Sequence, residues 1–301
     1  MSCYHPFYAL ILREKNSEGK MDLKLLPKRG SLREFQDMYG PKNVLSLPCG
    51  HCIGCAKDRV RNWTTRLCLE GKYHNHKCFL TLTYDDEHCP ERLVKRDLQL
   101  FFKRLRKEIS PIKVRYFACG EYGENTHRPH YHVILFGYDF PDKRFFSFGS
   151  NLDKVYVSKQ LSEIWSSGNC LIGDVSEQSC AYVAGYSTKK LLGDHLFKDE
   201  FVMMSTRPGI GYEYLEDNPD IYQVDKIYDS CLGSSKVARI PRFFDKKSVD
   251  ALEYVKSFRV KKSQLVATHK MMVRGEKYLE EVLKAEEKIA VYTPRYRVKG
   301  I

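Results

Sequence analysis

Two apolar, β-prone segments separated by a short polar turn constrain the fold of this chain more than any other feature. They are IKVRYFACGEYG at 112–123 and HYHVILFGY at 130–138. The turn is too short for the helical crossover that parallel neighbours need, so the two strands should pair as an antiparallel hairpin. The sequence therefore predicts a sheet with antiparallel strands at its centre.

Further helix and strand patterns surround this hairpin. Helices alternating with strands around a hairpin-linked centre are typical of an α+β fold, with a central antiparallel sheet flanked by helices. The predicted strands are 4–12, 22–28, 77–84 and 169–175, and the predicted helices are 55–73, 95–110, 159–166 and 177–192. Residues 31–48 are expected to be irregular, and 199–301 to contain strands and loops followed by a charged helix at about 275–289.

The length of 301 residues suits one large domain or two modest ones. We expect an N-terminal extension with a cysteine-rich turn at 1–54, a central domain at 55–200, and a partly helical C-terminal extension at 201–301. No run approaches the roughly 20 apolar residues that span a bilayer, and the first residues lack a signal-peptide pattern, so a membrane protein is not expected. The 11 cysteines, an odd number, suggest a reducing compartment with thiols that are free or bind metal.

The charge balance favours an anionic partner. Lys and Arg number 50 against 38 Asp and Glu, which gives a net charge of +12. Nucleic acid is the first candidate for such a chain. Lys57, Arg59 and Arg61 flank Trp63 on the predicted helix 55–73, and basic groups interleaved with an aromatic ring suit single-stranded DNA. The alternative is an ordinary solvated helix face.

A histidine pair on the second hairpin strand suggests a metal site. His130 and His132 lie two residues apart, so their imidazoles share one face of the strand while Tyr131 points to the other. Glu121, at the end of the preceding strand, can face this pair. Two histidines and one carboxylate leave open positions for Mg²⁺ or Mn²⁺ to act on a phosphate. The alternative is two surface histidines that merely decorate a strand.

Two tyrosines and two lysines share one face of the predicted helix 177–192. Tyr186, Lys189 and Lys190 follow Tyr182 by four, seven and eight residues. A phenol beside cations can act as a nucleophile on a metal-polarised phosphate, and the lysines can neutralise the charge that develops. The alternative is a half-buried aromatic stripe with solvated lysines.

A cysteine-rich segment, PCGHCIGC, precedes the first long helix. Cys49, Cys52 and Cys55 have a spacing that can wrap one Zn²⁺, and Cys3 is the candidate fourth ligand. A complete structural site normally shows a second C-x2-C pair, which this sequence lacks. A reduced turn without metal is therefore the alternative.

Three segments occur in an order that resembles a known superfamily. FLTLTY, GEYGENTHRPHYHVILFG and YVAGYSTKK resemble the three motifs of HUH-type rolling-circle replication initiators, and in particular those of microviruses of the gokushovirus branch. The resemblance covers roughly 45–245 and includes PCGHCIGC, MSTRPGIGYEYL and IPRFFDKK. It implies the HUH endonuclease fold for the central domain.

The resemblance also implies roles for individual residues. His130 and His132 would bind the divalent metal with Glu121, and Tyr182 and Tyr186 would be the paired nucleophiles, next to motif lysines Lys189 and Lys190. We expect Tyr186 to attack first, because both lysines follow it within one helical turn. The strand that carries Thr81 and Thr83 would contact DNA near the site.

The function implied is rolling-circle replication of a single-stranded DNA phage. The chain would nick and rejoin origin DNA through a 5′-phosphotyrosine in the host cytoplasm. It has no Walker-type G-x4-G-K-[ST] motif, so a host helicase and polymerase would act with it. One alternative is an HUH transposase or relaxase with the same chemistry. The other is a zinc-stabilised single-stranded-DNA-binding protein without catalysis.

Overall fold

The computed structural model describes residues 3–13, 22–27, 29–123, 127–149, 152–191, 199–222, 226–229, 237–245 and 247. They fall into two compact units, one up to Asp58 and one from Arg59 onward. The charged helix expected at 275–289 lies outside the described residues. No helix in the described part of the chain is both long and apolar enough to cross a membrane.

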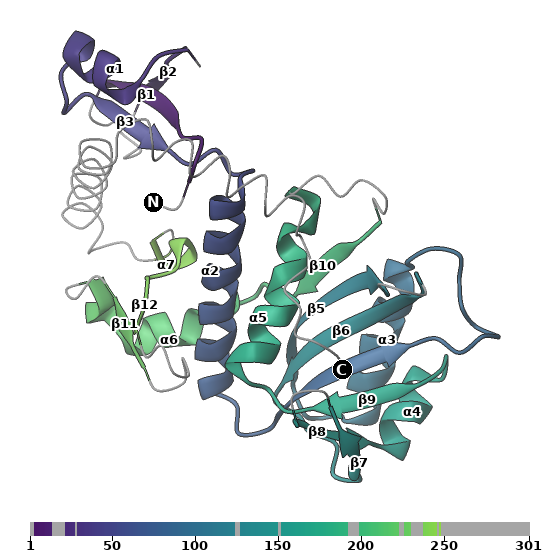
Figure 1. The fold of residues 1–301 in the computed structure, drawn as a ribbon. Helices are drawn as coiled ribbons and strands as arrows, with labels where there is room; N and C mark the ends of the chain where they lie inside the picture. Colours follow the sequence, from purple (N-terminus) through teal and green to yellow (C-terminus); the bar gives the residue numbers. More distant parts are fainter. Residues whose placement is uncertain are drawn as a thin grey trace. The chain divides into compact units, whose positions relative to one another are not determined.

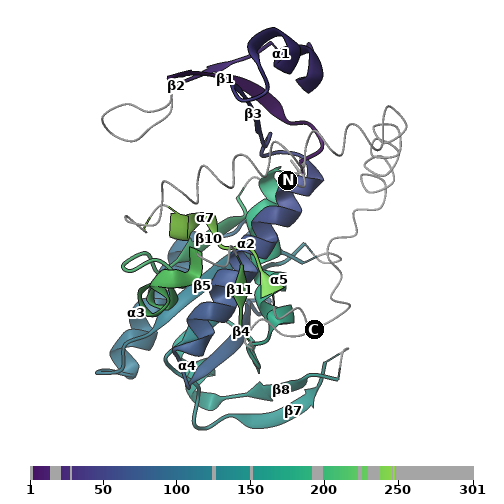
Figure 2. The same cartoon turned by 90° about the vertical axis from the view of Figure 1, so that its left-hand side faces the viewer.

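The first unit contains a three-stranded antiparallel sheet and one helix (Figures 1 and 2). The strand order is β2-β1-β3. Its small core consists of Leu32, Phe35 and Val44. The elements are β1 (Phe7–Arg13), β2 (Asp22–Leu25), α1 (Leu32–Tyr39) and β3 (Val44–Leu47).

The prediction that residues 31–48 are irregular is wrong, because this stretch holds α1 and β3. A capping box starts α1. Ser31 Oγ accepts from the Glu34 N–H at 3.2 Å, and Glu34 Oε2 accepts from the Ser31 N–H at 2.7 Å. This Ser-x-x-Glu signature was visible in the sequence. The helix ends at Gly40, whose φ of 86° suits a residue without a Cβ.

The second unit is organised around a seven-stranded antiparallel sheet with the order β10-β5-β6-β4-β9-β8-β7 (Figure 1). The predicted central hairpin is confirmed as β5 and β6. Three shorter strands, β7, β8 and β10, extend the two edges. The strands are β4 (Lys77–Thr83), β5 (Arg115–Tyr122), β6 (Pro129–Phe136), β7 (Arg144–Phe148), β8 (Lys154–Val157), β9 (Cys170–Gly173) and β10 (Phe201–Met204).

Alternation along the strands divides side chains between the two faces of this sheet. One face packs on α3 (Lys95–Glu108) and α4 (Lys159–Trp165) and forms the main core. Tyr131 belongs to this core and is fully buried. The opposite face carries His132 and meets α5 (Glu177–Gly185), as well as part of α2 (Ile53–Lys72) through the Trp63–Phe117 ring contact. The predicted α+β fold with a central antiparallel sheet flanked by helices is thus confirmed.

The α-helix predicted at 177–192 is too long. α5 ends at Gly185, and the chain continues as the 3-10 helix η1 (Tyr186–Leu191). Ser187 and Thr188 explain the change, because their hydroxyls donate to the carbonyls of Ala184 and Gly185 at 2.7 Å. Such local bonds, three residues back along the chain, compete with α-helical pairing and tighten the backbone.

Short elements follow β10 along the chain. They are α6 (Tyr212–Asp217), η2 (Pro219–Tyr222), β11 (Ile227–Tyr228), β12 (Val237–Ala238) and α7 (Arg242–Asp245). β10 pairs with β5, so the sheet extends past residue 200. The domain limits at 54/55 and 200/201 stay predictions.

A buried carboxylate ties α2 to distant parts of the second unit. Glu70, 2% exposed, forms an ion pair with Arg115 of β5 and accepts the Gly211 N–H at 2.6 Å. Burial by itself would raise the pKa of Glu70, but hydrogen bonds from His74, Arg115 and Gly211 outweigh it and hold that pKa below its ordinary value. The charge of Glu70 therefore contributes to the stability of the fold.

Candidate active site

The register of three strands brings the histidine pair and the glutamate together. In the β5–β6 ladder Glu121 lies opposite His130, and Cys119 lies opposite His132. On its other side β6 pairs with β4, where Thr81 lies opposite His132. Residues directly opposite each other in a sheet point to the same face, so Glu121 and both imidazoles share the face that α5 covers.

The three side chains meet at a single carboxylate oxygen. Glu121 Oε1 lies 2.9 Å from His130 Nε2 and 2.8 Å from His132 Nε2. Glu121 is 3% exposed and His132 4% exposed, whereas His130 is half-buried. One ligand atom from each residue lies within 4.8 Å of the other two. The predicted trio is therefore assembled in the structure.

Hydrogen bonds at the far side of each ring orient the two imidazoles. His130 Nδ1 lies 3.1 Å from the Arg128 carbonyl oxygen. A carbonyl can only accept, so Nδ1 of His130 carries the proton and Nε2 has the lone pair. His132 Nδ1 lies 3.2 Å from Thr81 Oγ1, an arrangement that also leaves Nε2 for a metal.

The donor set fits a divalent cation. Two imidazole nitrogens and a carboxylate oxygen converge from one side, which leaves coordination positions open to substrate and water. A buried carboxylate between two imidazoles also supplies the negative charge that a divalent ion requires. Such a set accepts several first-row ions as well as Mg²⁺, so it does not fix the identity of the metal.

Both tyrosines of the third motif reach this centre. Tyr182 Oη lies 3.2 Å from Glu121 Oε1 and 3.2 Å from His132 Nε2. The ring of Tyr186 is stacked on His132 with centroids 6.0 Å apart, and the centroids of the two tyrosines are 5.2 Å apart. Although η1 replaces the predicted α-helix, the expected juxtaposition of the two phenols is present.

The surroundings disfavour the ionised form of both phenols. Burial, followed by the charge of Glu121, raises the pKa of Tyr182 above its ordinary value. The same two causes raise the pKa of Tyr186. A divalent cation next to Glu121 would offset the second cause.

Sequence reasoning missed two contributions from β4. Phe79 stacks on His132, with centroids 5.5 Å apart and planes at 15°, and its ring also meets Tyr182 edge-on. Thr81 was predicted as a DNA contact, but its hydrogen bond goes to His132. The alternation of β4 with β6 was the available signal, since it puts these two side chains on the histidine face.

The remaining candidate residues lie at varied positions. Thr83 is half-buried opposite His130. On α2, Lys57 is half-buried, and Arg59 and Arg61 are exposed. Trp63 packs against Phe117, and the Arg66 guanidinium lies 4.1 Å from the centroid of its ring. DNA binding by these residues stays a prediction.

The side chains of Lys189 and Lys190 lie outside the described residues, although their backbone is part of η1. Their predicted action on the phosphate therefore stays a prediction. In the first unit, the four candidate zinc ligands Cys3, Cys49, Cys52 and Cys55 do converge.

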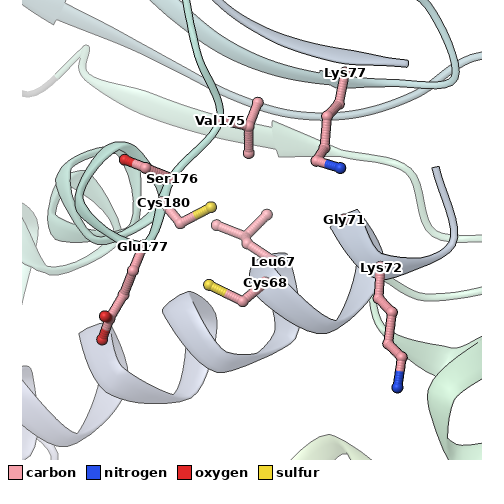
Figure 3. A pocket seen from close by; sticks show the side chains of 9 residues that line it. All are labelled: Leu67, Cys68, Gly71, Lys72, Lys77, Val175, Ser176, Glu177 and Cys180. Carbon is pink, nitrogen blue, oxygen red and sulfur yellow. The ribbon is translucent and has the colours of Figure 1, made fainter. Parts of the chain in front are cut away.

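A cavity of about 250 Å³ lies apart from this centre, between α2 and the start of α5. Figure 3 shows Leu67, Val175 and the thiols of Cys68 and Cys180 around it. Neither thiol forms a disulfide. The lining contains none of the candidate metal ligands or tyrosines, so we assign the cavity no part in the chemistry.

The sequence is similar to proteins of three phages. It is 31% identical over 271 residues to the replication-associated protein ORF2 of Spiroplasma virus 4, which covers 81% of this chain and 82% of that protein. It is 36% identical over 156 residues to the replication-associated protein VP4 of Bdellovibrio phage phiMH2K, 48% of this chain and 49% of that protein. It is 29% identical over 154 residues to the replication-associated protein ORF4 of Chlamydia phage 1, 48% and 39% of the two chains.

The profile of the replication-associated protein ORF2 family matches residues 77–191, the segment that holds the metal centre and both tyrosines. No solved structure matches the chain. The fold, the site and these likenesses together define a phage DNA-replication protein. Within that class, the chain belongs to the family of microvirus-type replication-associated proteins, the replication initiators that its motif order indicated.

Proposed function

We propose that this replication initiator is a metal-dependent endonuclease that nicks and rejoins single-stranded origin DNA through a phosphotyrosine. The observation that carries the proposal is the position of Tyr182, whose hydroxyl lies 3.2 Å from two candidate metal ligands, Glu121 and His132. A nucleophile within hydrogen-bond distance of an ion-binding centre suits phosphoryl transfer.

The groups of the site divide the work. Glu121, His130 and His132 would hold a Mg²⁺ or Mn²⁺ ion, which supplies Lewis-acid polarisation of the scissile phosphate. A tyrosine oxygen attacks the phosphorus in line, and the 3′-oxygen leaves. The phenol loses a proton, the 3′-oxygen gains one, and the 5′-phosphate stays on the tyrosine. Because one phosphodiester replaces another, rejoining needs no ATP.

Two tyrosines allow two successive transfers. After one round of synthesis, the second phenol attacks the regenerated origin, and the new 3′-hydroxyl attacks the first phosphotyrosine to release a circle. The spacing to Lys189 and Lys190 supports Tyr186 as the first nucleophile. Tyr182, hydrogen-bonded to Glu121, would then serve second. Host helicase and polymerase, in the host cytoplasm, would extend the free 3′-end.

A covalent-adduct assay tests the proposal. Full-length protein is incubated with single-stranded DNA of its replicon, with Mn²⁺ or with EDTA, and resolved under denaturing conditions. We expect a Mn²⁺-dependent adduct that Tyr182→Phe and Tyr186→Phe each reduce and the double variant abolishes. Tyr228→Phe is the control, because this tyrosine is 62% exposed on β11 and plays no part in the centre.

The outcomes also separate the alternatives. A DNA-binding protein without catalysis gives no adduct on any fragment while binding persists, and this result would refute the proposal. A transposase or relaxase gives the adduct on DNA other than a replication origin. The tyrosine pair at one centre favours the replication role.

A further inference from the structure

The four cysteines of the first unit come from separate segments of the chain. Cys3 precedes β1, Cys49 and Cys52 follow β3, and Cys55 lies in the first turn of α2. Their sulfur atoms all lie within 4.8 Å of one another. All four are free thiols, so no disulfide holds the cluster together.

The distances between sulfurs match the edges of a coordination tetrahedron. Cys49 Sγ lies 3.9 Å from Cys55 Sγ, and Cys52 Sγ lies 3.8 Å from Cys3 Sγ. Four thiolates at a Zn–S distance of about 2.3 Å lie about 3.8 Å apart when the geometry is tetrahedral. A disulfide would bring two sulfurs to about 2.0 Å. In a four-iron cluster each thiolate binds a different iron, which places the sulfurs farther apart than they are here.

Backbone amides point at three of these sulfurs. The Cys49 N–H donates to Cys3 Sγ at 3.2 Å, and the Cys52 N–H donates to Cys49 Sγ at 3.4 Å. The Tyr4 N–H donates to Cys52 Sγ at 3.4 Å. Amide donors stabilise thiolates and orient them, as outer partners do at metal sites.

We propose that Cys3, Cys49, Cys52 and Cys55 bind one Zn²⁺ in a structural site. Thiolates select Zn²⁺ over the harder ions that suit the Glu121 centre. Four protein ligands leave no position for substrate, so this metal holds structure and performs no chemistry. The four thiols release their protons as the ion binds.

The small size of the first unit gives the site a purpose. Its sheet buries only Leu32, Phe35 and Val44 as a core among the described residues. A core of this size needs an additional crosslink. The metal would join the chain before β1 to the turn that leads into α2, at the end of the sheet where β1 begins and β3 ends.

Cobalt substitution tests the site on the full-length protein. The metal-free, reduced chain is titrated with Co²⁺, and the near-ultraviolet band of thiolate-to-cobalt charge transfer is recorded. We expect saturation at one equivalent, visible bands of a tetrahedral ion, and displacement by one equivalent of Zn²⁺. The centre of Glu121, His130 and His132 has no thiolate, so this band reports on the cysteines alone.

Variants identify the ligands. Cys3→Ser and Cys52→Ser should weaken Zn²⁺ binding at the cluster at least about 100-fold. Cys89→Ser is the matched control, because Cys89 is another half-buried free thiol outside the cluster, and it should leave the titration unchanged. An unchanged cobalt band in Cys3→Ser would overturn the four-thiolate site.

A thiol count on the wild type decides the matter even where a variant fails to fold. Loading with Zn²⁺ should protect four thiols from a thiol reagent, the number in the cluster. Protection of fewer than four, absence of the cobalt band, or iron in place of zinc in the purified protein would each overturn the proposal. All of these readouts are independent of nicking, so the zinc site and the nuclease activity are tested separately.

Discussion

At the scale of single residues, the candidate active site depends on groups that hold the metal ligands as much as on the ligands. His130 is oriented by a main-chain carbonyl, and His132 by the Thr81 hydroxyl. A main-chain partner cannot be removed by substituting a side chain, whereas a hydroxyl can. Thr81 is therefore the position where orientation can be tested apart from ligation.

We predict that Thr81→Val weakens Mn²⁺ binding at the Glu121 centre by about 10- to 100-fold, because His132 loses the partner of its Nδ1. The variant keeps the size and β-branching of threonine, so β4 should fold normally. Thr83→Val is the control, since Thr83 occupies the same strand two residues on. Calorimetric titration with Mn²⁺ measures the effect. Equal losses in both variants would mean that Thr81 does not position His132.

At the scale of elements, short local signals decided where helices and turns begin and end. The capping box of Ser31 and Glu34 started a helix that the apolar pattern did not reveal. Ser187 and Thr188 ended α5 before the predicted limit. The turn into β9 depends on a glycine, Gly168, whose φ of 146° lies where only glycine is comfortable.

We predict that Gly168→Ala lowers the free energy of unfolding by at least about 2 kcal/mol, from the strained φ and from steric conflict. An added Cβ would collide with the backbone of Thr83 and Asp85, next to the strand that carries Thr81. Gly149→Ala is the control, because a Cβ there meets only ordinary contacts. Urea unfolding of both variants measures the difference. Equal stability of the two would refute the packing argument.

At the scale of the whole molecule, the second unit is held by contacts between segments far apart in sequence. Glu70 of α2 binds Arg115 of β5 and the amide of Gly211. Arg66, one turn earlier, donates to the Ile210 carbonyl at 2.9 Å, and its guanidinium lies 4.0 Å from the Phe243 ring centroid. Burial lowers the pKa of Arg66 to about 10, so it remains charged at neutral pH. The segments after β10 are thus anchored on α2.

We predict that Glu70→Gln lowers the free energy of unfolding at pH 7 by about 2–3 kcal/mol, because charge-assisted hydrogen bonds are lost. The pKa of Glu70 is lowered by folding, so its contribution is present above the unfolded pKa of about 4.3 and is lost as pH falls towards the folded value. The variant should therefore lose less stability than the wild type between pH 6 and pH 3, roughly the range around that unfolded value.

Urea unfolding at several pH values measures this effect. Glu163→Gln is the control, since Glu163 forms only an exposed pair with Lys159 at 3.7 Å and should behave as the wild type. The same pH profile for wild type and Glu70→Gln would contradict the assignment of the acid sensitivity to Glu70.

The sequence by itself determined the features that repeat with a short period. Alternation along 112–123 and 130–138 predicted the hairpin, and the same period put His130 and His132 on one face. These features follow from local backbone geometry, so they need no knowledge of distant residues. The motif order predicted the family for the same reason, because it is a property of the chain alone.

Only the tertiary structure decided which distant groups meet. The pairing of β4 with β6 put Thr81 and Phe79 on His132, and the packing of α5 brought Tyr182 to Glu121. It also brought Cys3 to the cysteine turn. Such contacts join residues that lie 46 or more positions apart, as for Cys3 and Cys49. Their geometry depends on strand register and core packing, which no local pattern contains.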